Sequence, residues 1–250
     1  MSKVDFKNFD WSQLNIPKLE ESQNNKSYRS CKPTLKNKKS VQFQIPFSLF
    51  PFGASPPNPE KKILKWSLPI ARDELPGITK PLSKEFFATM ENFDKFLINY
   101  ASKNAQLFFN VPTKGIESCT DFLNPCIKHD KNAEKDEKYG PRIQPELMFN
   151  KETNQFEKVQ ATNVKSEKIS ITDILPKSKG YAIIELTTFY SVNYKNYGAL
   201  WIVRNADIIE NLESETAPIK RTKYGECPAL PHIEDFYDPK LVDALRKNKK

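Results

Sequence analysis

The sequence predicts a mainly β protein of the α+β class, a partly open antiparallel β-barrel with one long amphipathic helix and a flexible arm at each end. Short runs rich in β-branched and aromatic residues recur along the chain, whereas only one segment has clear helical periodicity. Because strands do not alternate regularly with helices, a doubly wound parallel sheet is disfavoured.

Composition divides the 250 residues into three parts. Residues 1–40 hold nine Lys and Arg against four Asp and Glu and lack periodicity, which predicts a basic, flexible N-terminal arm. An apolar island between Phe6 and Leu14 suits contact with a partner or with the body of the protein. Residues 41–210 form the predicted folded domain, and residues 211–250 form a proline-broken tail that ends in a short helix.

The first half of the domain supplies two strands and the helix. Residues 41–45 alternate apolar side chains with glutamine, as in a half-buried strand, and Pro46 limits its pairing. A second strand is expected within residues 61–71, after a proline-rich loop. Residues 82–103 predict a helix because their apolar positions recur every three or four residues, at Phe86, Met90, Phe93, Leu97 and Tyr100.

The second half of the domain is richer in strands. Residues 145–150 and 156–161 predict a hairpin, and further strands are expected at residues 169–175, 181–192 and 198–210. Many short antiparallel strands around little more than one helix fit an OB-like fold.

The most informative stretch is KGYAIIELTTFYSVNYKNYGALWIVR, residues 179–204. It predicts two strands joined by a turn at residues 193–197, with aromatic rings interleaved with lysine and arginine. Such rings either fill a core, since aromatics are good strand formers, or stack with bases while the cations meet phosphates. Packing is expected mostly of Ile183, Leu186, Leu200 and Ile202, base contact of Tyr194 and Tyr197, and Trp201 is open between the two.

The same combination of rings and cations occurs outside the hairpin. The candidate nucleic-acid-binding residues are Lys61, Lys65, Trp66, Arg142, Lys179, Tyr190, Tyr194, Lys195, Tyr197, Trp201 and Arg204. The net charge of +8 favours a polyanionic partner, but residues 41–210 are nearly neutral, so folding has to segregate their charges. If the predicted register of a strand is wrong by one residue, the side chains assigned to the core lie in the DNA-binding groove instead, and the reverse.

No pattern in the sequence indicates catalysis, a cofactor or a metal. The seven glycines form no phosphate-binding motif, and the two histidines lie in no nucleophile or metallohydrolase motif, so we expect no enzyme activity. Metal-ligand residue types occur at Cys119, Cys126 and His129 and at Cys227 and His232, but C-x6-C-x2-H is not a usual zinc spacing.

The sequence also bears on location. The first ten residues lack the apolar core of a signal peptide, and no apolar stretch approaches the roughly 18 residues of a membrane span. The four cysteines are then expected to be reduced thiols of an intracellular protein without a membrane partner.

The order of elements from Val41 to Ile209 resembles the OB-fold single-stranded-DNA-binding proteins of nucleocytoplasmic large DNA viruses. The resembling pieces are VQFQIP, PFGAS, KILKWSLPI, FFATMENFDKFLINYASK, KYGPRIQPEL and KGYAIIELTTFYSVNYKNYGALWIVRNADII. They span about two-thirds of the chain. The resemblance implies a non-enzymatic protein that coats single strands during viral replication, recombination or repair, in a cytoplasmic viral factory or the host nucleus.

The resulting hypothesis is a sequence-nonspecific single-stranded-DNA-binding protein, with RNA as an alternative strand. Residues 41–210 would bind the strand, the arm around Lys32–Lys39 would add salt-sensitive attraction, and the tail would recruit replication proteins. Homo-oligomerisation is a further expectation. One alternative is a viral structural or scaffold protein that uses the arms and the aromatic hairpin for protein contacts. Another is an accessory protein that binds duplex DNA.

Overall fold

The computed structural model describes residues 6–7, 9–46, 48–50, 63–69, 80–129, 141–150, 152–153, 155–157, 159–163, 165–174 and 178–210. The predicted C-terminal tail, the proline-rich loop and the candidate Lys61 lie outside the described residues.

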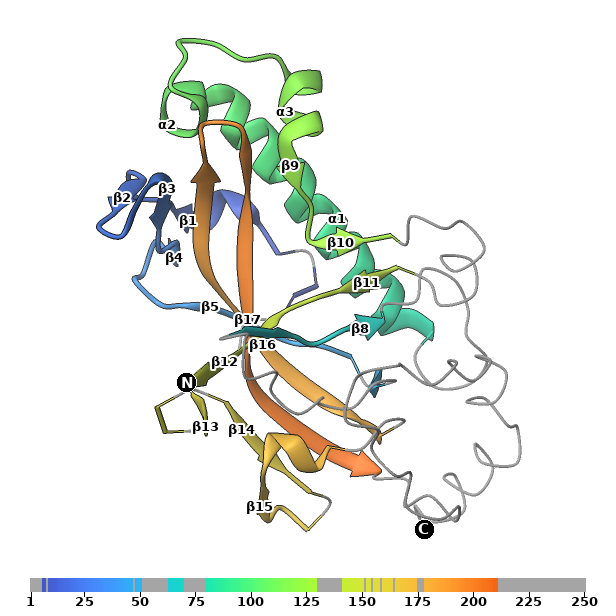
Figure 1. The fold of residues 1–250 in the computed structure, drawn as a ribbon. Helices are drawn as coiled ribbons and strands as arrows, with labels where there is room; N and C mark the ends of the chain where they lie inside the picture. The colour runs from blue at the N-terminus through green and yellow to red at the C-terminus, as the bar shows by residue number, and fades with distance from the viewer. Residues whose placement is uncertain are drawn as a thin grey trace.

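A long β-hairpin runs through the middle of the fold (Figure 1). Its strands are β16 (Ser178–Val192) and β17 (Asn196–Glu210), each of 15 residues, or about 50 Å of extended chain at about 3.3 Å per residue. Register shifts along β16, one of them between Leu186 and Thr188, act as bulges that bend and twist the pair. The predicted hairpin is confirmed, and both of its strands are longer than expected.

Short strands pair along both outer edges of this hairpin. The strands beside β16 are antiparallel to it: β3 (Asn25–Cys31), β5 (Val41–Gln44) and β6 (Ser48–Phe50). The strands beside β17 are parallel to it: β9 (Leu123–Asn124), β12 (Glu146–Asn150) and β14 (Gln160–Thr162). The main order is β13-β12-β17-β16-β3-β2, an open sheet that is not closed into a barrel.

The remaining strands extend this sheet or form small sheets beside it. Those of the main sheet are β2 (Glu20–Ser22), β7 (Ile63–Lys65), β13 (Gln155–Glu157) and β15 (Lys168–Ile169). A three-stranded sheet has the order β10 (Ile127–Lys128), β11 (Arg142–Ile143) and β8 (Leu68–Pro69). A two-stranded sheet joins β1 (Leu14–Asn15) to β4 (Thr34–Leu35). Short 3₁₀ turns occur at Trp11–Gln13 and Ile171–Asp173.

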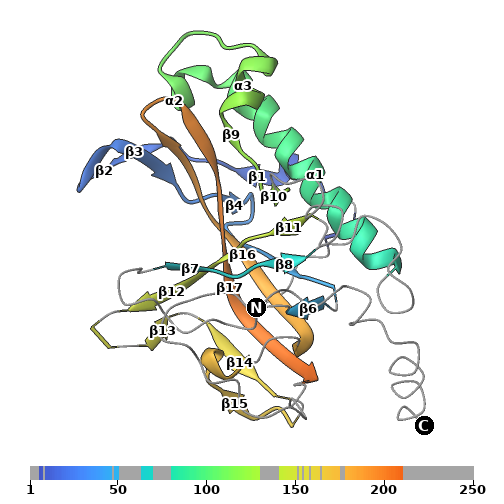
Figure 2. The same cartoon turned by 45° about the vertical axis from the view of Figure 1, so that its right-hand side comes forward.

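The predicted long helix is present as α1 (Lys80–Lys103) and runs beside the hairpin (Figures 1 and 2). Its predicted stripe faces the core, because Phe86, Met90, Phe93 and Leu97 are fully buried. Two short helices, α2 (Ala105–Phe109) and α3 (Ile116–Phe122), lie near the turn of the hairpin (Figure 1). The expected mainly β fold with one long amphipathic helix is therefore confirmed.

The N-terminal segment departs from the expected flexible arm. Residues 11–35 form a 3₁₀ turn and the strands β1 to β4, and β3 joins the main sheet beside β16. The apolar island packs into the core: the Phe6 ring lies 5.2 Å from Phe86, and the Trp11 ring 4.5 Å from Phe93. Burial of these rings outweighs the polar composition of the segment, so residue 40 marks no structural boundary.

Replacing Trp11 with alanine tests this arrangement. Because the indole is buried against Phe93, we expect Trp11→Ala to lower the free energy of unfolding by about 3–5 kcal/mol in urea titrations. The matched control is Gln13→Ala, at an exposed position of the same turn. Equal stability of the two variants would show that the segment is the flexible arm expected from its composition.

Candidate nucleic-acid interface

The hairpin near its turn has two unlike faces, because successive side chains of a strand point to opposite sides. One face, here the helical face, consists of Phe189, Ser191 and Tyr197 and packs against the helices. Phe189 contacts Phe93 of α1, and the Ser191 hydroxyl donates a 2.6 Å hydrogen bond to the Phe108 carbonyl of α2. No helix of the described residues covers the opposite face, which is only partly buried.

A stacked pair of tyrosines lies on that opposite face. The rings of Tyr28 in β3 and Tyr190 in β16 are 5.9 Å apart with an interplanar angle of 17°. The Tyr190 hydroxyl accepts a 2.6 Å hydrogen bond from the Asn124 side-chain amide. Both rings are partly exposed, so an aromatic surface remains available to a flat ligand.

A glycine sets the position of the Tyr190 ring. Gly198 lies directly opposite Tyr190 in the ladder, and a Cβ atom there would come within 2.8 Å of the tyrosine hydroxyl and 2.9 Å of the Asn124 carbonyl. The ring therefore crosses β17 only because position 198 has no side chain. Burial is the main reason that the pKa values of Tyr28 and Tyr190 are raised.

One cation, Lys128, is linked to the tyrosine pair through Asn124, and two more, Arg142 and Lys65, are neighbours of Lys128. The Lys128 ammonium donates a hydrogen bond to the Asn124 side-chain oxygen, and Asn124 in turn contacts Tyr190. Lys128 is directly opposite Arg142 in the β10–β11 ladder, so their side chains share a face. Burial is the main cause of the lowered pKa of Lys128, and the charge of Lys65 adds to it.

Glu146 is an acid of the same surface. Glu146 is directly opposite Lys65 in the β12–β7 ladder. Burial raises the pKa of Glu146, against the lowering effect of Lys65. Its charge also contributes to the raised pKa values of both tyrosines, which places it near them. We call the set Tyr28, Tyr190, Asn124, Lys65, Lys128, Arg142 and Glu146 the tyrosine platform.

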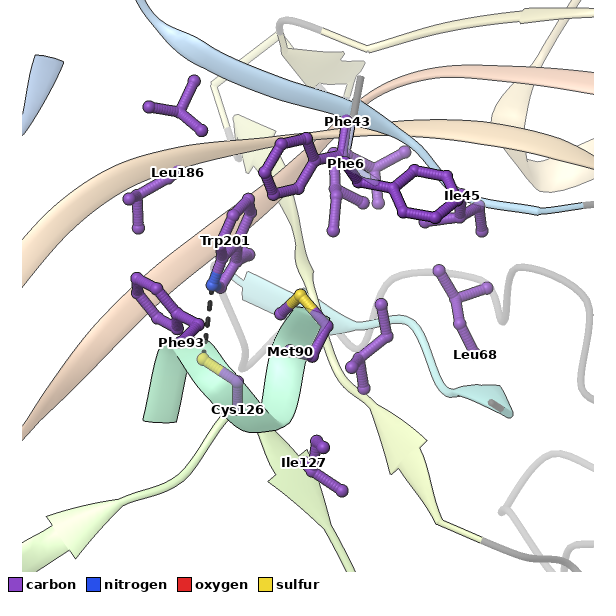
Figure 3. Close-up of a cluster of buried hydrophobic side chains, with 14 of the residues drawn as sticks. Phe6, Phe43, Ile45, Leu68, Met90, Phe93, Cys126, Ile127, Leu186 and Trp201 are labelled. Carbon is purple, nitrogen blue, oxygen red and sulfur yellow. Dashed lines mark hydrogen bonds between the residues drawn. The ribbon is translucent and has the colours of Figure 1, made fainter. Parts of the chain in front are cut away.

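Four predicted contact residues are buried, which corrects their expected roles. Tyr197 has no exposed surface, and its hydroxyl donates a 3.0 Å hydrogen bond to the Cys119 carbonyl. Trp201 lies in the core, where its indole N–H donates to the Cys126 sulfur and its ring packs on Phe43 and Phe93 (Figure 3). Trp66 packs on Phe50, and Lys179 is 5% exposed in β16. None of these side chains presents a surface to a DNA strand.

Arg204 also has a structural role in place of the expected phosphate contact. Its Nε donates a 2.5 Å hydrogen bond to the carboxylate of Glu185, which is 3% exposed. The Gln42 amide donates to the same oxygen at 2.9 Å. The ion pair ties β17 to β16, and the buried carboxylate depends on both donors.

The last two candidates, Tyr194 and Lys195, lie at the turn of the hairpin and are exposed. The Lys195 amide donates to the Val192 carbonyl, and φ is positive at Asn193 and Tyr194, as in a type I′ turn. Asparagine suits the first central position, but tyrosine at the second costs about 1 kcal/mol or more, since glycine is preferred there. The Arg29 guanidinium lies 3.8 Å from the centre of the Tyr194 ring.

Sequence reasoning missed Tyr28, Arg29, Asn124 and Lys128. Tyr28 and Arg29 lie in the segment whose composition predicts a flexible arm. The QNN run within residues 20–31 is a turn signal between two strands and could have indicated a hairpin there. Asn124 and Lys128 lie in two-residue strands that are too short to show periodicity.

The described residues contain no group of three or more His, Cys, Asp or Glu side chains placed to hold a metal ion. The potential zinc ligand Cys126 instead accepts a hydrogen bond from Trp201. Within the same residues, no helix has the length and apolar character needed to cross a membrane.

Comparisons with known proteins gave structural similarity alone. No protein-family model matches the chain, and no curated protein sequence matches it. The fold is similar to gp2.5, a single-stranded DNA binding protein encoded by bacteriophage T7, with a TM-score of 0.45 and 12% identity over 74% of this chain and 98% of that one. It is also similar to the single-stranded DNA-binding protein from bacteriophage Enc34 in complex with ssDNA, with a TM-score of 0.41 and 12% identity over 80% and 98% of the two chains.

The structural role of Arg204 gives a testable prediction. Arg204→Ala leaves the Glu185 carboxylate buried without its cation, so we expect the free energy of unfolding to fall by about 3–5 kcal/mol in urea titrations. The control Lys95→Ala breaks the exposed ion pair between Lys95 and Glu91 and should lower the free energy of unfolding by about 0.5 kcal/mol or less. An Arg204→Ala variant of normal stability and weakened DNA affinity would instead support the phosphate contact expected from the sequence.

Proposed function

We propose that the protein binds single-stranded DNA without sequence preference, on the tyrosine platform. Bases stack on Tyr28 and Tyr190, and phosphates meet Lys65, Lys128 and Arg142. The observation that carries the proposal is the stacked, partly exposed tyrosine pair, to which Lys128 is linked through Asn124 with Arg142 and Lys65 as neighbours of that lysine. Either feature alone is common on protein surfaces; together they match the stacking surface and positive charge of single-strand binding sites.

The geometry favours an unpaired strand over a duplex. Aromatic rings need an accessible base face, and the bases of a duplex are already stacked on one another. Every base has such a face, so stacking tolerates any sequence. The Asn124 amide donates its hydrogen bond to the Tyr190 hydroxyl, and this contact holds the ring in place.

The broader role of the protein belongs to the same proposal. The sequence resemblance to proteins of large DNA viruses supports a role in viral DNA replication, recombination or repair, in a viral factory or the host nucleus. A non-enzymatic coat for exposed single strands, with replication proteins as partners of the tail, is consistent with that role. The platform gives no comparable support to the scaffold alternative, which needs no cations beside the rings.

Removing one ring of the pair tests the stacking contact. We expect Tyr28→Ala to weaken binding to oligothymidylate roughly 5- to 150-fold, the equivalent of about 1–3 kcal/mol for one base stack. Tyr28→Phe keeps the ring and should bind like the wild type in fluorescence anisotropy titrations. Unchanged affinity of Tyr28→Ala, with an intact fold by circular dichroism, would exclude the platform as the binding site.

Salt dependence tests the phosphate contacts. The logarithm of the binding constant falls with the logarithm of the salt concentration, at about 0.7 per phosphate for single strands. Lys65→Ala and Lys128→Ala should therefore each reduce this slope by about 0.7. Lys95→Ala removes the same charge from the exposed surface of α1 and should leave the slope unchanged.

The same titrations, repeated with a duplex of equal length as competitor, separate the alternatives. We expect the single strand to bind more tightly at every salt concentration. Equal or tighter binding of the duplex would favour the alternative of an accessory protein that binds duplex DNA. An absence of salt-dependent binding to either form of DNA would favour the alternative of a structural or scaffold protein.

A further inference from the structure

The exposed ring at the hairpin turn lies on the other side of the hairpin from the tyrosine platform. Tyr28 and Arg29 are consecutive residues of β3, so their side chains point to opposite faces of the sheet. Arg29 is on the helical side, where its guanidinium donates a 3.1 Å hydrogen bond to the Phe108 carbonyl. The Tyr194 ring packs on that guanidinium. The two aromatic surfaces are therefore separated by the hairpin itself.

The unfavourable backbone conformation of Tyr194 in the turn indicates a functional role for this residue. Tyr194 has a φ of 55°, a left-handed conformation that glycine or asparagine adopts far more readily. Residues that keep an unfavourable backbone conformation are concentrated at binding and active sites. The ring is also one of the few large apolar groups that stay exposed among the described residues, at 36%.

The surroundings of the ring suit a nucleotide. Arg29 is 9% exposed, and the Phe108 carbonyl holds its guanidinium, so the guanidinium supports one side of the ring from a fixed position. One exposed lysine, Lys195, follows Tyr194 directly in the turn. An aromatic ring with an ammonium group close by in the chain is the same combination of groups as on the platform.

We propose that Tyr194, supported by Arg29, is a second nucleobase subsite, and that a strand bound on the tyrosine platform passes around the hairpin turn to reach it. This inference rests on the proposed binding of single-stranded DNA. The platform and Tyr194 lie on opposite faces of the hairpin, so only a DNA strand that extends past the platform and around the turn reaches Tyr194. The tip subsite therefore adds affinity for long strands and none for short ones.

Titrations with oligothymidylates of increasing length, from about 4 to about 30 nucleotides, test the subsite. We expect Tyr194→Ala to weaken binding of the longest oligonucleotides roughly 5- to 150-fold. The affinity for the shortest oligonucleotide with measurable binding should not change. Tyr194→Phe should match the wild type at every length. Tyr194→Gly should show the same loss as alanine while relieving the backbone strain, so a loss caused by misfolding would appear in alanine alone.

Tyr28→Ala in the same series keeps the two proposals apart. If Tyr28→Ala weakens binding of oligonucleotides of every length and Tyr194→Ala weakens binding of none, the tip subsite is excluded and the platform remains the binding site. If Tyr194→Ala weakens short and long strands equally, the ring belongs to one continuous site, and passage around the turn is excluded. If neither variant changes binding at any length, both proposals fail.

Discussion

The antiparallel pairing of β16 with β17 is the interaction around which the main sheet is built. Each of the two strands is paired on its outer edge as well, so the hairpin organises strands that come from the whole described chain. Its alternating side chains impose a division. Phe189, Ser191 and Tyr197 must be covered, and the helices α1, α2 and α3 cover them. These helices do not cover the other face, and the tyrosine platform lies there.

Much of the fold could be predicted from local patterns in the sequence. The helical stripe of α1 and the alternation of apolar residues with glutamine in β5 are strong signals, because a buried face imposes its period on the sequence. The N-terminal segment could not be predicted in the same way. Trp11 and Phe6 reach the core from a polar segment, and only the tertiary structure supplies the partners that stabilise them.

The site was harder to predict than the fold, because it depends on register. The sequence suggested a turn at residues 193–197, but β17 already begins at Asn196. This difference moves Tyr197 from a loop into a strand, opposite Ser191 and beneath α2. Tyr190 and Tyr197 look alike in the sequence, yet one is on the platform and the other is in the core. Tyr28 reaches the platform only through a ladder between distant segments, which no local pattern encodes.

The stacked pair of Tyr28 and Tyr190 also constrains how the protein is made. The two rings come from opposite ends of the described chain, and Asn124 comes from its middle. A growing chain on the ribosome therefore has no platform until β17 has emerged and paired. Contacts between such distant segments form slowly, because a long loop has to close first. Any ligand that touches both rings binds only the finished fold, and by mass action it holds the N-terminal strands on the rest of the protein.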